Sequence, residues 1–260
     1  MTETETPPEA RVLVVIDDTV ATVTLDRPAK LNALGPAMLA ELEAAVAAID
    51  RNHDVRAVIL TGAGDRAFCV GADVHAWSVL DPFDMWRAWV RDGHRVLRRL
   101  ASVRQPTIAA VNGYAFGGGL ELALAADIRI AAESAMFAMP ETKIGTLPGW
   151  AGTSRLPAAI GSARAKQMIF TGARIDGATA ERWGLITEVV PLEQLLDRAR
   201  AIAAEIAANA PISVQLAKAA IDGDDTALEA FASALAAMTG DGQEGIAAFR
   251  EKRPPHFTGR

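Results

Sequence analysis

Two glutamates stand in apolar runs of the sequence, where an unpaired carboxylate is costly. Glu121 lies in the segment GGLELALAA, and Glu141 follows Pro140 before a loop rich in glycine and proline. Because burial of a carboxylate carries a large desolvation cost, such a pair needs a reason. Two nearby carboxylates can divide acid and base roles between them. The simpler alternatives are a glutamate favoured by the helix dipole for Glu121 and a helix or turn cap for Glu141.

Glycine-marked turns beside these glutamates are suited to presenting backbone N–H groups. Gly117, Gly118 and Gly119 lie between a predicted strand and a predicted helix, where free N–H groups at the helix N-terminus favour negative charge. Upstream, the segment AFCVGADV at 67–74 is typical of a strand that ends in a loop, with the Ala72 N–H as a second donor. Two converging donors would form an oxyanion hole for a carbonyl compound, each worth roughly a hundred- to a thousandfold in rate. Tight strand–helix packing and an ordinary surface loop are the alternatives.

Alternating strands and helices must position these residues. The pattern predicts a hairpin of strands at 12–17 and 20–25, a helix over 36–50, a buried strand over 55–62, a helical segment over about 82–103, a buried strand over 107–113, a helix over 118–126 and a strand over 127–132. Alternation of buried β-branched runs with helices indicates an α/β architecture with mainly buried strands.

The composition changes near the C-terminus. After Pro191 the sequence is almost wholly helical, in four pieces separated by Pro211, Asp222-Gly223 and Gly240. We therefore predict a disordered tail at 1–10, an α/β core at 11–205 and a C-terminal helical region at 206–260.

Charge and composition exclude several classes of protein. A net charge of −6 argues against nucleic acid as a partner. The acidic N-terminus lacks the features of a signal peptide, and no apolar run is long enough to span a membrane, so we expect a cytoplasmic protein. Cys69 is the only cysteine, which excludes an intramolecular disulfide and a thiolate metal cluster, and we expect it to be a buried core residue. The four histidines are scattered, so we predict no metal site.

Six motifs, taken in order, carry a resemblance that runs from about residue 12 to 257. They are DRPAKLNAL, AFCVGADV, VNGYAFGGGLELALAADIRIA, FAMPETKIGTLPG, TGARIDGATAERWGL and AAFREKRPPHF. At these motifs the chain resembles the enoyl-CoA hydratase/isomerase (crotonase) family. The resemblance implies an α/β fold, the crotonase (ClpP-like) spiral of β-β-α turns with a C-terminal helical trimerisation region. It also implies a homo-oligomer, either a trimer or a dimer of trimers.

The resemblance assigns roles to the residues already singled out. Ala72 and Gly118 match the oxyanion-hole positions, and Glu121 and Glu141 match the two catalytic glutamates of hydratases, at the same spacing. Relatives with other chemistry often lack one or both glutamates, so the pair favours enoyl-CoA hydration. In that reaction Glu121 would activate water and Glu141 would supply the C2 proton. Another acyl-CoA lyase or isomerase of this fold is the alternative, and a non-catalytic RNA-binding or scaffold member is a remote one.

The resemblance also implies where coenzyme A lies. As part of the substrate rather than a cofactor, it would follow residues 27–33 and 67–73, and no other cofactor is expected. The implied binding residues include Arg27, Lys30, Ala33, Ala67, Gly71, Asp73 and Gly117. Lys30 stands one position from the family's basic residue in the first loop. Phe249 and Lys252 resemble positions that reach coenzyme A from a neighbouring subunit.

The chain departs from the family pattern near the acyl group. Trp150 interrupts the usual Pro-Gly-x-Gly-Gly stretch, and Met139 replaces a common glutamine. Trp77, Trp86 and Trp89 lie in the segment that usually shapes the acyl pocket. Four tryptophans around one pocket would suit a ring-bearing or branched acyl group, whereas ordinary core packing is the alternative for the last two.

Overall fold

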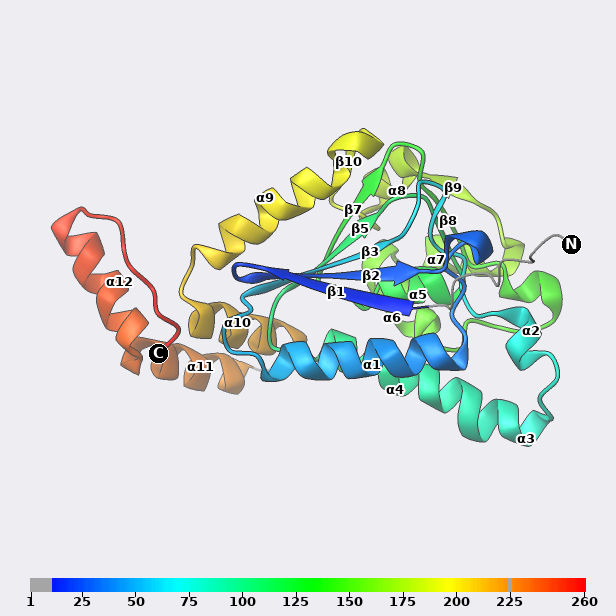
Figure 1. The fold of residues 1–260 in the computed structure, drawn as a ribbon, viewed down its shortest axis with the longest axis horizontal. Coiled ribbons are helices and arrows are strands. Elements are labelled where there is room, and N and C mark those ends of the chain that lie inside the picture. Colours follow the sequence, from blue (N-terminus) through cyan, green and yellow to red (C-terminus); the bar gives the residue numbers. More distant parts are fainter. Residues whose placement is uncertain (1–10, 224–225) are drawn as a thin grey trace, which may run out of the picture.

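The computed structural model describes residues 11–223 and 226–260, so the predicted tail at 1–10 lies outside the described residues. In the described part of the chain, the strands form a six-stranded sheet in the order β1-β2-β3-β5-β7-β10 and a four-stranded sheet in the order β4-β6-β8-β9 (Figure 1). The strands are β1 (Arg11–Asp17), β2 (Val20–Asp26), β3 (Ala57–Gly62), β4 (Ala67–Cys69), β5 (Thr107–Val111), β6 (Tyr114–Phe116), β7 (Ile128–Ala132), β8 (Met136–Ala138), β9 (Ile175–Asp176) and β10 (Glu188–Val190).

From β3 to β8, consecutive strands alternate between the two sheets. β3, β5 and β7 belong to the larger sheet, β4, β6 and β8 to the smaller one, and helical segments follow each pair, so the chain repeats a β-β-α turn. β4 pairs in parallel with β6, and β6 with β8. Their carboxyl ends therefore meet at one edge, which brings together three loops from distant parts of the sequence.

The strands are joined and followed by helices. The helices are α1 (Pro36–Arg51), α2 (Val74–Trp77), α3 (Pro82–Asp84), α4 (Arg91–Ala101), α5 (Gly118–Ala123), α6 (Gly152–Ile160), α7 (Ser162–Thr171), α8 (Gly177–Trp183), α9 (Leu195–Ala207), α10 (Pro211–Gly223), α11 (Thr226–Met238) and α12 (Gly240–Glu251). Shorter turns are the 3-10 segments η1 (Pro28–Lys30), η3 (Glu141–Ile144) and η4 (Leu192–Gln194), and the π-helical segment η2 (Met85–Val90). The helix predicted over 36–50 is confirmed, and the helical segment predicted over 82–103 is divided among α3, η2 and α4.

The strand predicted over 107–113 ends early. β5 stops at Val111, because Asn112 and Gly113 form a turn that leads into β6. The Asn112 side-chain amide donates to the carbonyl oxygens of Gly62 and Gly64 at 2.9 and 2.7 Å. A Cβ atom at Gly113 would lie 2.3 Å from the carbonyl oxygen of Arg66. Apolar periodicity alone does not reveal such a turn inside a buried run.

The central strands β3 and β5 are buried on both faces, which explains their nearly continuous apolar sequences. In β3, Val58 and Leu60 join the main core, whereas Ala57 and Ile59 join a second cluster formed with α9. The predicted boundary at 205 therefore lies within α9, a helix that packs against the sheet.

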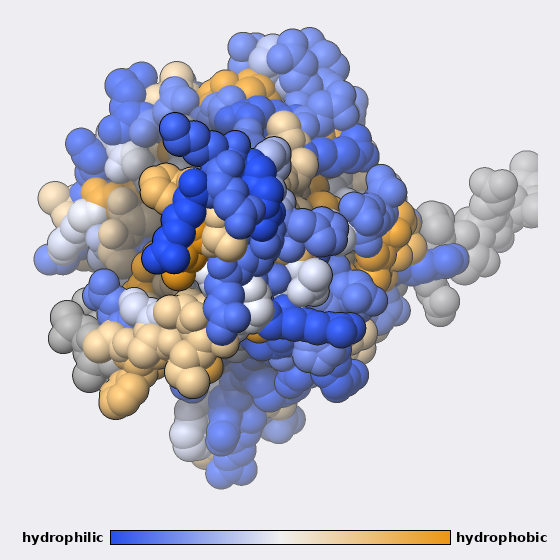
Figure 2. Space-filling view, turned by 90° about the vertical axis from the view of Figure 1, so that its left-hand side faces the viewer, coloured by the Kyte–Doolittle hydropathy of each residue, from blue (hydrophilic) through white to orange (hydrophobic). Residues whose placement is uncertain are grey.

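The helices α11 and α12 extend away from the sheets at one end of the molecule, whereas α10 contacts the core, where Lys218 Nζ donates to Asp127 Oδ2 at 2.8 Å (Figure 1). Figure 2 shows this end, where apolar surface lies among charged surface. The large apolar side chains exposed on α11 and α12 are Leu228, Phe231, Leu235, Met238, Ile246 and Phe249. None of the helices, over the residues described, is sufficiently long and apolar to cross a membrane.

Candidate active site

The loops that follow β4, β6 and β8 enclose a cleft of about 530 Å³. It is lined by all four residues predicted to take part in chemistry, namely Ala72, Gly118, Glu121 and Glu141. Sequence positions spread over seventy residues thus meet at one place because β4, β6 and β8 are parallel neighbours.

Ala72 is oriented by a single parallel bridge to Leu34. The Leu34 N–H donates to the Gly71 carbonyl and the Asp73 N–H donates to the Leu34 carbonyl, each at 2.8 Å. In this pattern the bonds come from the residues flanking Ala72, so its own N–H points away from Leu34. Gly71 has φ +101°, and a Cβ atom there would lie 2.8 Å from the Phe116 carbonyl oxygen. A glycine is therefore required for the loop to approach β6 this closely.

Gly118 supplies the second backbone N–H. As the first residue of α5, it has an N–H without an acceptor inside the helix. A Cβ atom at Gly118 would lie 3.3 Å from the Ala72 nitrogen, so the two N–H groups are close neighbours. The arrangement can hold a carbonyl oxygen between two donors and stabilise negative charge on it.

Glu121 is held on α5 with 2% of its surface exposed. Its Oε1 atom accepts hydrogen bonds from the backbone N–H groups of Trp150 and Gly152, both at 2.7 Å. Burial raises the pKa of Glu121 to about 7, and the nearby charge of Glu141 raises this pKa further, whereas the two hydrogen bonds and Arg155 oppose the shift. The carboxyl can therefore take up or release a proton near neutral pH.

Glu141 begins the 3-10 segment η3. A Cβ atom at Gly117, which has φ +50°, would lie 2.8 Å from Glu141 Oε1, so the carboxylate lies directly against this glycine. The Oε2 atom is buried and has no hydrogen-bond partner among the described residues. Burial raises the pKa of Glu141 above its ordinary value. A buried oxygen without a partner is available to a substrate in the cleft.

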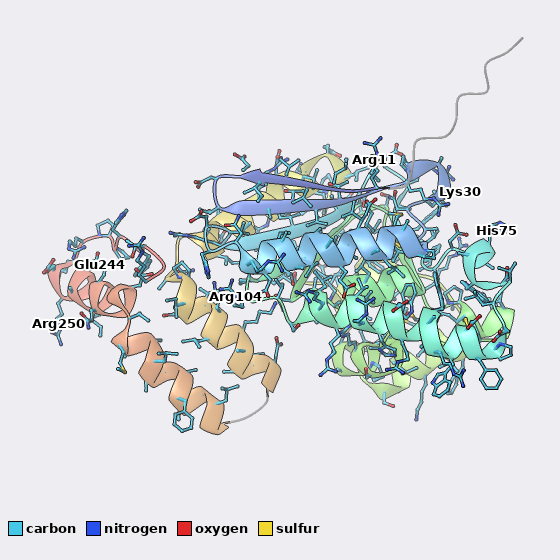
Figure 3. All side chains as sticks on the ribbon, turned by 60° about the horizontal axis from the view of Figure 1, so that its bottom comes forward. Arg11, Lys30, His75, Arg104, Glu244 and Arg250 are labelled. Atoms are coloured by element: carbon cyan, nitrogen blue, oxygen red, sulfur yellow. The ribbon has the colours of Figure 1, made fainter. Side chains whose placement is uncertain are left out.

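The residues predicted to contact coenzyme A lie on neighbouring loops. Arg27 Nη1 donates to Asp73 Oδ2 at 2.7 Å and to the Ala33 carbonyl at 3.1 Å, so these three form one contact group. Ala67 begins β4. Lys30 is exposed at the end of η1, and Figure 3 shows it on the same side of the molecule as His75 of α2.

Two predicted residues are not brought to the cleft by this chain. Phe249 is 86% exposed on α12, and Lys252 is the C-cap of that helix. Figure 3 shows Arg250 and Glu244, also on α12, at the opposite end of the molecule from Lys30.

Other predictions concerned the surroundings of the cleft. Trp77, Trp86, Trp89 and Trp150 all line it. Cys69 is buried, as expected, and burial raises the pKa of its thiol to about 12.

Met139 is fully buried in the core and does not line the cleft. No cluster of potential metal ligands occurs within the described ranges.

Sequence reasoning missed Gly93, a glycine inside α4. A Cβ atom there would lie 1.9 Å from Trp150 Nε1. An isolated glycine inside a helical pattern costs about 1 kcal/mol relative to alanine, and this was the available signal of a close contact.

The cleft thus contains one buried and one half-buried carboxyl group together with the backbone N–H groups of Ala72 and Gly118, a combination suited to acid–base chemistry on a carbonyl compound. Residues 15–260 match the family model described as enoyl-CoA hydratase/isomerase. The chain is 42% identical to the short-chain-enoyl-CoA hydratase of Clostridium acetobutylicum, over 90% of this chain and 92% of that one. It is also 42% identical to the (E)-benzylidenesuccinyl-CoA hydratase of Thauera aromatica, over 95% of this chain and 99% of that one.

The fold agrees with these relatives. The crystal structure of an enoyl-CoA hydratase from Bacillus anthracis superimposes with a TM-score of 0.92 at 40% identity, covering 96% of this chain and all of that one. The chain belongs to the enoyl-CoA hydratase/isomerase family and has the crotonase fold. The fold implied by the sequence motifs is thereby confirmed.

Proposed function

We propose that this protein is an enoyl-CoA hydratase, which adds water across the C2=C3 double bond of a 2-enoyl-CoA thioester. The observation that carries the proposal is the presence of Glu121 and Glu141 in the same cleft as Ala72 and Gly118. Coenzyme A enters as part of the substrate, along the loops that hold Arg27 and Lys30.

The two N–H groups polarise the thioester carbonyl. As water adds to C3, electron density moves from the double bond to the thioester oxygen, where the donors of Ala72 and Gly118 stabilise it. Glu121, fixed by two backbone hydrogen bonds, removes a proton from the attacking water. Glu141 delivers a proton to C2 from its free oxygen, and proton exchange with solvent then restores both carboxyl groups.

We also propose that the chain acts as a homo-oligomer, as is typical of the family. The exposed apolar side chains of α11 and α12 support this proposal, because an unassembled chain would leave them in water. Phe249 and Lys252 would then contact the coenzyme A of a neighbouring subunit. Light scattering coupled to size-exclusion chromatography measures the assembly directly.

The test of the reaction is the loss of the enoyl-thioester absorbance of crotonyl-CoA, with identification of the product by mass spectrometry. A gain of one water, at C3, is expected. A shifted double bond or a cleaved carbon chain would instead assign the protein to another reaction of the same fold.

A further inference from the structure

Beyond the carboxylates, the cleft forms a chamber with aromatic walls. Trp89 and Trp150 are 6% and 2% exposed, and their ring centroids lie 5.5 Å apart with the planes tilted by 48°. Trp86 is 61% exposed and also lines the cleft. Two tryptophans are thus fixed as walls and a third lies at the entrance.

Trp150 reaches from the candidate oxyanion hole to helix α4. A Cβ atom at Gly118 would lie 2.7 Å from its Cζ3 atom, and one at Gly93 would lie 1.9 Å from its Nε1 atom. The indole therefore fills the space between these two glycines and places a flat aromatic surface beside the expected thioester carbonyl. Gly93 is explained by this contact, because any larger residue would displace the indole.

The other wall is formed by the π-helical segment η2. Met85, Trp86, Trp89 and Val90 all belong to it and all line the cleft. A π-helical turn is wider than an α-helical one and often occurs at functional sites. It allows two tryptophans, together with a thioether that packs well against rings, to line one chamber.

The chamber offers almost no positive charge to an acyl group. No lysine or arginine of the described chain lines the cleft. Its ionisable side chains, within the described residues, are Glu121, Glu141 and His94. An acyl group with a carboxylate of its own would meet two carboxyl groups and no permanent cation.

We infer that the chamber accepts an uncharged acyl group whose C3 carries an aromatic ring, which packs against the Trp89–Trp150 pair, with Gly93 as the residue that makes room for the Trp150 indole. The inference rests on the proposed function where it concerns the reaction. The preference for a ring-bearing acyl group rests only on the residues that line the chamber. A ligand ring that packs against this pair gains from offset or edge-to-face contact. A rigid ring also loses less conformational freedom on binding than a flexible alkyl chain.

The first experiment measures binding without chemistry. Isothermal titration compares the saturated thioesters 3-phenylpropanoyl-CoA and hexanoyl-CoA, which share coenzyme A and cannot be hydrated. The ring-bearing ligand is expected to bind about fivefold to tenfold more tightly, as one or two aromatic contacts provide. Equal affinity, or tighter binding of hexanoyl-CoA, would overturn the inference.

The second experiment uses the dehydration direction, in which 3-hydroxy-3-phenylpropanoyl-CoA loses the C3 hydroxyl and a C2 proton as water. Its kcat/KM is compared with that of 3-hydroxyhexanoyl-CoA. We expect the ring-bearing substrate to be preferred. If neither substrate reacts while the binding preference persists, the inference on the acyl group stands and the proposed function fails.

Variants link the preference to the named residues. Trp150→Leu keeps an apolar wall without the ring and should lower the binding preference about fivefold. Trp183→Phe is the control, because Trp183 lies outside the cleft. Gly93→Ala should lower the preference similarly, with no further loss when combined with Trp150→Leu. An unchanged preference in Trp150→Leu would overturn the inference even if Gly93→Ala failed to fold.

Discussion

The two regions that carry the candidate catalytic glutamates are built differently. Glu121 belongs to helix α5, and its Oε1 atom is bound by two backbone N–H groups. Glu141 belongs to the short segment η3, and its Oε2 atom has no partner among the described residues. The fold therefore fixes one carboxyl group and leaves an oxygen of the other to the substrate.

This difference suggests why one site needs both arrangements. A group that activates water must hold the water at one position, which a fixed carboxylate does. A group that delivers a proton to C2 must approach an atom that changes geometry during the reaction. Burial destabilises the ionised form of both carboxyl groups. It therefore raises both pKa values and lowers folding stability where the groups are ionised.

The largest predicted effect is on catalysis. Glu121→Gln and Glu141→Gln should each lower kcat for crotonyl-CoA hydration by roughly a thousandfold, because each removes one proton-transfer group. Glu133→Gln, at an exposed position, is the control and should retain full activity. If only one of the two variants were impaired, the division of roles between the regions would be wrong.

The second prediction concerns stability and separates the two regions. The pKa of Glu121 rises from 4.5 to about 7 on folding, so wild-type stability should fall as the pH rises from 4.5 to 7. Above pH 7, Glu121→Gln should increase the free energy of unfolding by about 3 kcal/mol, an effect that should vanish below pH 4.5. Glu141→Gln should act in the same direction but less strongly, since Glu141 is less buried.

Urea unfolding of both variants and of wild type, at pH 8 and pH 4, provides the measurement. The glutamine at 121 can still accept the hydrogen bonds from Trp150 and Gly152, so the comparison isolates the charge. Equal stability of Glu121→Gln and wild type at pH 8 would contradict the buried, fixed carboxylate.

Much of this arrangement could be predicted from the sequence. The glycine run and the spacing of Glu121 and Glu141 indicated the reaction class, and the strand and helix alternation indicated the fold. The rest depends on contacts between segments far apart in the chain. The Ala72 N–H is oriented by a bridge to Leu34, and the position of the Trp150 indole depends on Gly93. The bridge leaves no periodic or compositional signal, and the contact of Gly93 is signalled only by a glycine inside a helical pattern.

The third prediction is the pH dependence of turnover. If ionised Glu121 is the base, kcat/KM should fall about tenfold per pH unit below pH 7, its pKa being about 7. Initial rates of crotonyl-CoA hydration from pH 5 to 9 test this. A flat profile down to pH 5 would assign the base to a group with an ordinary carboxyl pKa. A Glu121 with a raised pKa would then not be the base.

The smallest effect is expected at the loop that follows Glu141. Gly145 has φ +77°, and a Cβ atom there would meet no atom within 4 Å. Gly145→Ala should therefore lower stability by about 1 kcal/mol through backbone strain alone, with kcat/KM unchanged. Gly35→Ala is the matched control, because its Cβ atom also meets nothing and its φ is −100°. Thermal unfolding and steady-state rates of both variants separate strain from catalysis. A clear loss of kcat/KM in Gly145→Ala would mean that this left-handed turn fixes Glu141 as firmly as the two backbone N–H groups fix Glu121, and the two regions would then differ in construction but not in rigidity.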